Sequence, residues 1–296
     1  MPASRRFGLS AAASTPFHED GRINHALLVE HVQWCLANGC GSVTAFGTTG
    51  EGASIALAER EQVFGALAAH RIGGDKIVGG VAAVPVLDAV AQARAALDFG
   101  CRALLLAPPF YFKNVSDDGL FRWFAQVFEA LGGAARDVLL YHIPSMTQAG
   151  LSVALVGRLR KEFPEIIAGV KDSSGDWSNT EALLQQHADL AILVGDERQL
   201  ARAVRAGAQG TICGLANICP DAVLPLAEKG QDDPRIKQLV DGLEKFPVIP
   251  AVKAIIAHRT GERSWLNTRA PLLPVAGAEL TAVTRHYDAI FAAKAA

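Results

Sequence analysis

The chain has 296 residues, of which 50% are hydrophobic and 20% are charged, so it is long and apolar enough to bury a large core. The formal net charge of -2 leaves no basic surplus, which argues against binding to nucleic acid or to an anionic membrane through bulk charge. No apolar stretch reaches transmembrane length, and segment 1–17 runs into a Thr-Pro turn, so we expect neither a membrane span nor a signal peptide.

Short apolar runs of strand length alternate along the chain with segments that carry apolar residues at helical spacing. Each run is typical of a strand buried on both faces. The eight expected strands are 7–13, 42–47, 76–81, 102–108, 137–143, 166–171, 190–195 and 209–214. Expected helices lie between them, and the clearest are 24–39, 86–100, 116–133 and 196–207.

Two of these helices carry start signals. Asn24 is a candidate N-cap of the first, and Ser116, followed by two acidic residues, begins the helix over 116–133.

Eight strands alternating with helices predict an α/β fold of the (β/α)8 TIM-barrel type. A doubly wound open sheet is the competing fold, but no GxGxxG follows the first strand and eight strands fit a barrel better. We expect residues 1–230 to form the barrel with the active site, and residues 231–296, which contain only helical patterns, to form a C-terminal helical extension.

The five cysteines are scattered and form no CxxC pair: Cys35, Cys40, Cys101, Cys213 and Cys219. We therefore expect reduced thiols in a cytoplasmic protein. The eight histidines are dispersed and no HExxH occurs, so the sequence predicts no metal site.

The segment "GTTGE" follows the second strand, at the barrel end where active sites lie. Gly47 and the second glycine allow a ligand to approach the backbone closely, and Thr48 and Thr49 add hydroxyls to successive N–H groups. The segment could hold a carboxylate. A strand-to-helix turn with capping threonines explains the same residues equally well.

Aromatic residues follow the fourth and fifth strands. The cluster "PPFYF" at 108–112 is more typical of a core or an interface than of catalysis. Tyr141, near the end of the fifth strand, could transfer a proton or could simply bond a backbone carbonyl. His142 should point to the opposite side of that strand, so we interpret it as structural.

Lys171 ends an apolar strand, and a lysine is seldom buried without a partner. Burial in an apolar barrel disfavours its charged form, and a neutral amine can attack a carbonyl to form a Schiff base. We therefore interpret Lys171 as a nucleophile. A lysine in a buried ion pair is the alternative.

Segments in the order "STPF", "GTTGEGASIALAERE", "PPFYFKNVSDDGL", "YHIPS", "AGVKDSSGD", "GAQGTICGLAN" and "TRAPLLPV" resemble the dihydrodipicolinate synthase / N-acetylneuraminate lyase family over nearly the whole chain. The resemblance implies a barrel with a helical tail, a class I Schiff-base mechanism on pyruvate or another 2-oxo acid, and no metal or organic cofactor. It also implies a homotetramer.

By matching position, the resemblance makes Lys171 the Schiff-base lysine and Tyr141 the proton-transfer tyrosine. Thr48 and Thr49 would bind the pyruvate carboxylate, and Thr48 would also link the tyrosines. The backbone carbonyl of Ile212 would line the site.

The second tyrosine of the family reaches into a neighbouring subunit's site. The matching position here is Tyr111. This chain carries one extra residue before "VSDDG", which leaves Phe112 as the alternative.

One position departs from the dihydrodipicolinate synthases. Met146 stands where their arginine binds the carboxylate of the aldehyde substrate, and methionine cannot grip a carboxylate. Gln148 nearby offers only a neutral hydrogen bond. This argues against lysine biosynthesis and favours cleavage, condensation or dehydration of a 2-oxo-3-deoxy sugar acid or related 2-oxo acid. An N-acetylneuraminate lyase has weak support.

Two other functions stay open at this point. One is a dihydrodipicolinate synthase, which condenses pyruvate with aspartate semialdehyde and takes its carboxylate contact from elsewhere. The other is a non-catalytic protein that binds 2-oxo acids on the same scaffold, because a fold does not by itself imply catalysis.

Overall fold

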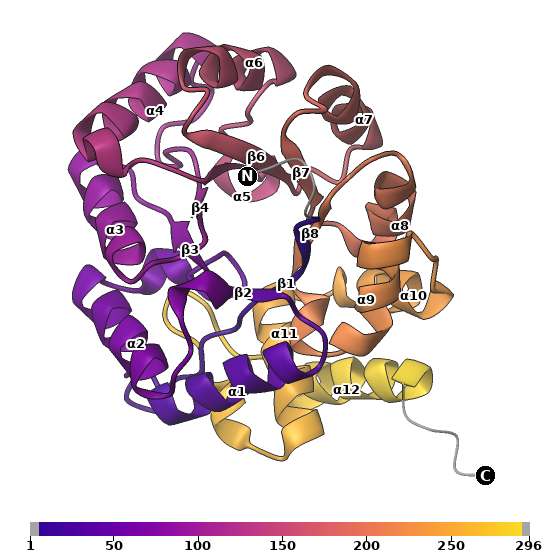
Figure 1. Ribbon diagram of the computed structural model, residues 1–296. Coiled ribbons are helices and arrows are strands. Elements are labelled where there is room, and N and C mark those ends of the chain that lie inside the picture. Colours follow the sequence, from indigo (N-terminus) through magenta and orange to yellow (C-terminus); the bar gives the residue numbers. More distant parts are fainter. Residues whose placement is uncertain (1–5, 292–296) are drawn as a thin grey trace.

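The computed structural model describes residues 6–291. Residues 1–5 and 292–296, which belong to the expected barrel and helical extension respectively, lie outside the described residues. Eight parallel strands form a closed barrel in chain order, and helices surround it (Figure 1). The predicted TIM barrel is confirmed.

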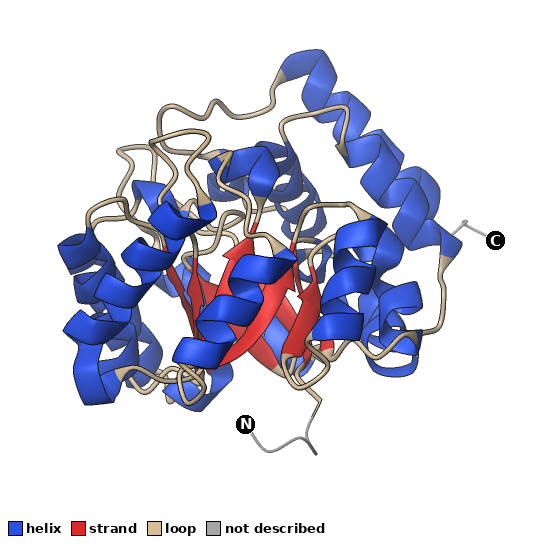
Figure 2. Cartoon of the chain, turned by 90° about the horizontal axis from the view of Figure 1, so that it is seen from above, coloured by secondary structure: helices blue, strands red, loops and turns tan. Residues whose placement is uncertain are grey.

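Each expected strand is present; most are shortened by one to three residues, and the sixth starts one residue later and extends one residue further, to Asp172. The strands are β1 (Gly8–Ala12), β2 (Ser42–Ala45), β3 (Ile77–Val81), β4 (Ala103–Leu106), β5 (Val138–His142), β6 (Ile167–Asp172), β7 (Ala191–Val194) and β8 (Gly210–Cys213). Pairing of β1 with β8 closes the barrel. Figure 2 shows the strands enclosed by the helices, which is why nearly every strand residue is buried on both faces.

The helices that follow the strands form the outer ring. They are α1 (His25–Ala37), α2 (Leu57–Ala69), α3 (Val86–Asp98), α4 (Asp117–Leu131), α5 (Pro144–Thr147), α6 (Val153–Glu162), α7 (Trp177–Gln186), α8 (Glu197–Arg205) and α9 (Pro220–Lys229). Short 3-10 turns are η1 (Gly52–Ser54), η2 (Gly74–Lys76), η3 (Gly132–Ala134) and η4 (Leu215–Asn217).

Two of the predicted helix starts have the expected cap. The Asn24 side chain accepts a hydrogen bond from the Leu27 N–H, and the Ser116 side chain accepts one from the Gly119 N–H. These side chains satisfy backbone donors that have no partner within the helix, so the sequence determines where α1 and α4 begin.

The chain after α9 contains α10 (Pro234–Leu243), α11 (Val248–Thr260), the 3-10 turn η5 (Arg263–Leu266) and α12 (Gly277–Phe291). Helix α10 packs on α8, and α12 packs on α10 and α11, so this part of the chain covers one side of the barrel (Figure 1). The expectation that it contains no strand holds for its described residues.

Candidate active site

Lys171 and Tyr141 lie side by side on neighbouring strands. They are direct partners in the register of β5 and β6, so both side chains point into the barrel. The Lys171 Nζ donates a hydrogen bond to the Tyr141 hydroxyl at 3.2 Å, and it lies 4.3 Å from the centre of the tyrosine ring. Both residues are buried, with 5% of Lys171 exposed. The hydrogen-bond partner of the buried amine is therefore a phenol, and within residues 6–291 it forms no ion pair with a carboxylate.

Thr48 extends this contact to the other side of the barrel. It follows β2, and its Oγ1 lies 3.3 Å from the Tyr141 hydroxyl, at hydrogen-bond distance. The three side chains form a chain from Thr48 through Tyr141 to Lys171. A proton could move along such a line without a metal ion.

A tight turn presents Thr48. The Glu51 N–H donates to the Thr48 carbonyl at 3.0 Å, and Glu51 has a left-handed φ of 55°. The Gly52 N–H donates to the Gly47 carbonyl at 3.0 Å, and a Cβ on Gly52 would lie only 1.8 Å from the Phe46 carbonyl oxygen. Position 52 must therefore be a glycine.

Two connected chambers open beside these residues. The lysine chamber has a volume of about 460 Å³ and is lined by residues that include Thr49, Lys171, Ser173, Gly195, Glu197 and Ile212. The apolar chamber has a volume of about 290 Å³ and is lined by residues that include Gly47, Val81, Ala82, Leu105, Ala107 and Phe110. Residues that line both chambers are Thr48, Tyr141, Ile143, Met146, Ile249 and Leu272.

Seven of the eight residues singled out from the sequence therefore come together around the chambers. Met146 lies at the opening, with 56% of its surface exposed, whereas Ile212 is fully buried. Tyr111 does not join them: it is 73% exposed and lines neither chamber, and neighbouring Phe112 is 64% exposed. Their rings contact each other edge to face at 5.3 Å.

Gly195 is a site residue that sequence reasoning missed. It follows β7, and a Cβ there would lie 2.0 Å from the Ser173 Oγ and 3.3 Å from the Lys171 Cε. The glycine therefore leaves room for the lysine side chain. Its position after a strand could have indicated a site residue, but glycines follow many strands without any role in a site.

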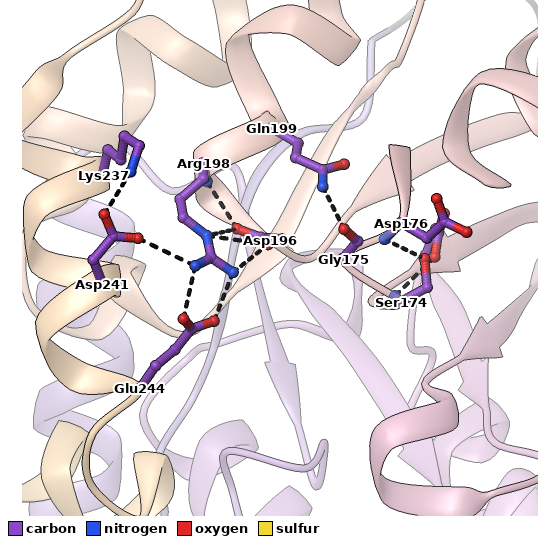
Figure 3. A network of polar contacts seen from close by, with 10 residues as sticks. Ser174, Gly175, Asp176, Asp196, Arg198, Gln199, Lys237, Asp241 and Glu244 are labelled. Atoms are coloured by element: carbon purple, nitrogen blue, oxygen red, sulfur yellow. Dashed lines mark hydrogen bonds and ion pairs between the residues drawn. The ribbon is translucent and has the colours of Figure 1, made fainter. Parts of the chain in front are cut away.

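Glu197 was also missed. It is buried, and its Oε1 accepts a hydrogen bond from the Leu215 N–H at 2.9 Å. Burial raises the pKa of this carboxyl group above its usual range. A cluster of ion pairs lies next to it, in which Arg198 binds Asp196, Asp241 and Glu244 (Figure 3). Arg198 therefore has three carboxylate partners, and it lines neither chamber.

A buried ion pair lies under the turn that carries Thr48. The Lys253 Nζ, from α11, contacts the Glu51 Oε1 at 2.6 Å, and both side chains are fully buried. Sequence reasoning missed this pair because its members are 202 positions apart.

His142 lies outside the barrel wall, as expected. Its Nδ1 accepts a hydrogen bond from the Leu151 N–H at 2.8 Å, and burial lowers the pKa of the imidazole. It lines neither chamber.

Over residues 6–291, no three His, Cys, Asp or Glu side chains gather as ligands for a metal ion. All five cysteines are free and buried. In the same range, no helix has the length and apolar character needed to cross a membrane.

The fold and the buried lysine place this chain among TIM-barrel proteins with a site at the carboxyl ends of the strands. Residues 6–290 match the model of the dihydrodipicolinate synthetase family, and the chain belongs to this family. It is therefore an enzyme of the lyase and aldolase type that acts on small molecules.

Two curated relatives illustrate the match. The chain is 33% identical to an uncharacterized DapA-like lyase of Chloroflexus aurantiacus, over 96% of this chain and 97% of that protein. It is 32% identical to a 4-hydroxy-tetrahydrodipicolinate synthase of Neisseria meningitidis, over 72% of each chain.

Solved structures agree with the fold. A crystal structure of dihydrodipicolinate synthase from Agrobacterium tumefaciens has 52% identity and a TM-score of 0.95, with coverage of 97% of this chain and 100% of that one. A variant of 2-keto-3-deoxygluconate aldolase from Sulfolobus solfataricus has a TM-score of 0.83 and 96% coverage of both chains, but its 18% identity supports the fold alone.

Proposed function

We propose that this protein is a class I lyase in which Lys171 forms a Schiff base with pyruvate or another 2-oxo acid. The amine attacks the ketone carbon, the carbonyl oxygen leaves as water, and the protonated imine then accepts the electron pair of the neighbouring carbon. The observation that carries this proposal is the buried Lys171 Nζ, which is hydrogen-bonded to Tyr141 and forms no ion pair with a carboxylate of the described residues.

The other residues have roles that fit their positions. Tyr141 transfers the proton, since its hydroxyl lies between the lysine and Thr48. Thr48 and Thr49 bind the carboxylate of the 2-oxo acid beside Gly47, and Ile212 forms part of the wall. These roles are the ones that the family resemblance implies.

The second part of the substrate carries no carboxylate in this proposal. Lys171 is the only basic residue among the described residues that line the two chambers, and Met146 lies at their opening. Arg198, nearby, has three carboxylate partners. A second substrate carboxylate inside the chambers would find no lining cation besides Lys171 to pair with, a loss worth on the order of 2–5 kcal/mol. We therefore favour a 2-oxo-3-deoxy sugar acid or a related 2-oxo acid.

A second candidate is 4-hydroxy-tetrahydrodipicolinate synthase, which condenses pyruvate with aspartate semialdehyde. The names of the Neisseria relative and the Agrobacterium structure favour it. A coupled assay with millimolar aspartate semialdehyde tests it, and the absence of any signal would eliminate this candidate.

We further propose a cytoplasmic homotetramer that needs no metal or organic cofactor. The free, buried cysteines suit a reducing compartment, and the exposed Tyr111 and Phe112 suit a subunit contact. Undiminished activity after dialysis against a chelator would support the proposal that the protein needs no metal ion.

The experiment that tests the mechanism is trapping of the imine. The protein is incubated with pyruvate and borohydride, its intact mass is measured, and the modified peptide is mapped. We expect a reduced pyruvate adduct on the Lys171 peptide and none in Lys171→Ala. If the wild-type protein binds pyruvate without an adduct or turnover, the non-catalytic 2-oxo-acid-binding protein takes the place of the lyase.

A further inference from the structure

A single ion pair joins the C-terminal helices to the turn that presents Thr48. The Lys253 Nζ contacts the Glu51 Oε1 at 2.6 Å, and the relative exposure of both side chains is 0%. The ammonium group also lies 4.5 Å from the centre of the Phe17 ring. Both side chains are thus fully buried, and Glu51 also lines the apolar chamber.

The second oxygen of Glu51 is also used. The Glu51 Oε2 accepts a hydrogen bond from the backbone N–H of Arg269 at 2.9 Å. The Arg269 side chain then donates to the carbonyls of Gly21 and Ser54, at 2.7–2.9 Å, and pairs with Glu59. The two carboxylate oxygens of Glu51 are therefore bound by two parts of the chain: one by the segment after η5, and the other by α11.

The same residue closes the turn on its upper side. The Glu51 N–H donates to the Thr48 carbonyl, and Glu51 itself has a left-handed φ of 55°. A left-handed backbone is unfavourable for a residue with a Cβ, so the surrounding contacts have to maintain it. Glu51 thus couples its buried carboxylate directly to the backbone that carries Thr48.

A buried ion pair is a poor means of stabilising a fold, because desolvation offsets most of the Coulomb attraction. Burial indeed lowers the pKa of Lys253, against the opposing effect of Glu51. What such a pair provides well is a fixed geometry, since either charge left alone in the interior is costly. The pair lies directly under the turn that carries Thr48, whose position the binding of a carboxylate depends on.

We propose that Glu51 and Lys253 are positioning residues that hold the Thr48 turn in the geometry that binds the carboxylate of the 2-oxo acid. Helix α11 of the C-terminal region is then a part of the active site without contacting substrate. The kinetic test of this inference rests on the proposed function, because it measures the formation of the pyruvate adduct.

The test uses the double variant Glu51→Gln/Lys253→Met, which removes both charges and nearly keeps both shapes. We expect it to fold, because replacing both members of a buried pair leaves no unpaired charge. In the borohydride assay, the pyruvate concentration that gives half-maximal adduct formation should rise at least about tenfold, because a displaced threonine no longer grips the carboxylate. The limiting rate at saturating pyruvate should change less than the half-maximal concentration, since the contact between Lys171 and Tyr141 is kept and only the contact of Tyr141 with Thr48 is disturbed.

The matched control is Asp288→Asn in α12, which removes the negative charge of a carboxylate whose Oδ1 lies 2.9 Å from the Nε2 of His258 in α11. It should leave the half-maximal concentration unchanged. A folded double variant with the wild-type value would overturn the proposal and make the pair purely structural.

Hydrogen exchange in a single variant tests the proposal if the double variant does not fold or if wild type forms no adduct. In Glu51→Gln alone, a neutral Lys253 amine can still bond the amide, so the protein should fold. Hydrogen exchange of peptides that span residues 46–52 should be faster than in wild type, with exchange over 166–175 unchanged. Unchanged exchange over 46–52 would contradict the proposal. Because this measurement needs no pyruvate, it also tests the positioning role if wild type forms no adduct and the proposed function fails.

Discussion

Tyr141 is the side chain on which the proposed chemistry depends most closely, because its hydroxyl contacts both Thr48 and Lys171. The phenyl ring fills the barrel interior, and the hydroxyl alone makes the polar contacts. Removing only the hydroxyl should therefore separate the proton transfer from the packing.

We predict that Tyr141→Phe slows turnover by about 10²-fold or more, the usual effect of losing a general acid or base. The melting temperature should stay close to that of wild type, because the ring remains. Turnover and thermal unfolding of the same preparation check this. Tyr287→Phe, in α12 and outside both chambers, is the control and should keep full activity. Equal turnover of Tyr141→Phe and wild type would exclude the proposed proton transfer.

The sequence predicted Lys171 and Tyr141 together because each ends a buried strand, and the ends of parallel strands meet at one end of a barrel. It could not predict Gly195, whose importance comes from the space that Ser173 and Lys171 need. The residue pattern around Tyr111 fits a core as well as an interface, so the pattern alone could not decide that this side chain is exposed. Glycine sterics and loop direction depend on the folded backbone.

At the scale of elements, His31 attaches helix α1 to the carboxyl end of the barrel, next to β1 and β8. This histidine is buried, and its Nε2 lies 2.8 Å from the Oδ1 of Asn217, which follows β8 in η4. The ring of Trp265, from η5, packs edge-on against it at 4.8 Å. Three parts of the chain therefore meet at one imidazole.

This contact predicts a dependence of stability on pH. Burial lowers the pKa of His31 from 6.5 to about 4, so between these values the unfolded chain binds a proton that the folded chain does not. The free energy of unfolding should therefore fall as the pH decreases from 6.5 towards 4, by about 2–3 kcal/mol from this group. Urea unfolding at several pH values measures it.

The variant His31→Gln separates this effect from other titrating groups. It should be less stable than wild type at neutral pH, but the difference should shrink on acidification. A constant difference from neutral pH to about pH 4 would show that His31 does not titrate in this way.

The eight strands were predictable because strands buried on both faces appear as short apolar runs between turn signals. The helices α1 and α4 were predictable at their starts because their cap residues are local in sequence. The short helix α5 (Pro144–Thr147) was not expected, since four residues carry no helical period. The Glu51–Lys253 pair was beyond sequence reasoning because it depends on how α11 packs against the barrel.

At the scale of the whole molecule, the boundary at residue 230 marks only where the sequence changes from alternating strands and helices to helices alone. The two parts of the chain contact each other extensively. Trp265 is 1% exposed, and helix α11 buries nearly all of its first ten residues. Lys253 pairs with Glu51 of the barrel. We therefore predict that the chain ending at residue 230 does not fold as a stable barrel.

Circular dichroism and gel filtration of residues 1–230 check this prediction. Loss of a cooperative melting transition, or aggregation, is the expected result, because the truncation exposes apolar surface and leaves Glu51 buried without its cation. A monomer that melts cooperatively would contradict it and would make the C-terminal region a separable unit.

Assembly gives a prediction for Tyr111. If this side chain reaches the site of a neighbouring subunit, Lys171→Ala and Tyr111→Ala should each have low activity. Mixing and refolding the two variants should then recover activity, because some sites receive an intact copy of both residues. Sedimentation of wild type should give a tetramer. No recovery in the mixed sample, with tetramers formed, would assign the role to Phe112 or to neither residue.

The closed barrel draws the residues of its site from distant parts of the chain: Thr48 and Tyr141 are 93 positions apart, and Glu51 and Lys253 are 202 positions apart. Contacts of such long range form late in folding, because the entropy of closing large loops has to be overcome first. During refolding from urea, helical circular dichroism should therefore return before the ability to form a pyruvate adduct. Adduct formation on Lys171 would thereby report the final folding step, when the last strand and the C-terminal helices have docked.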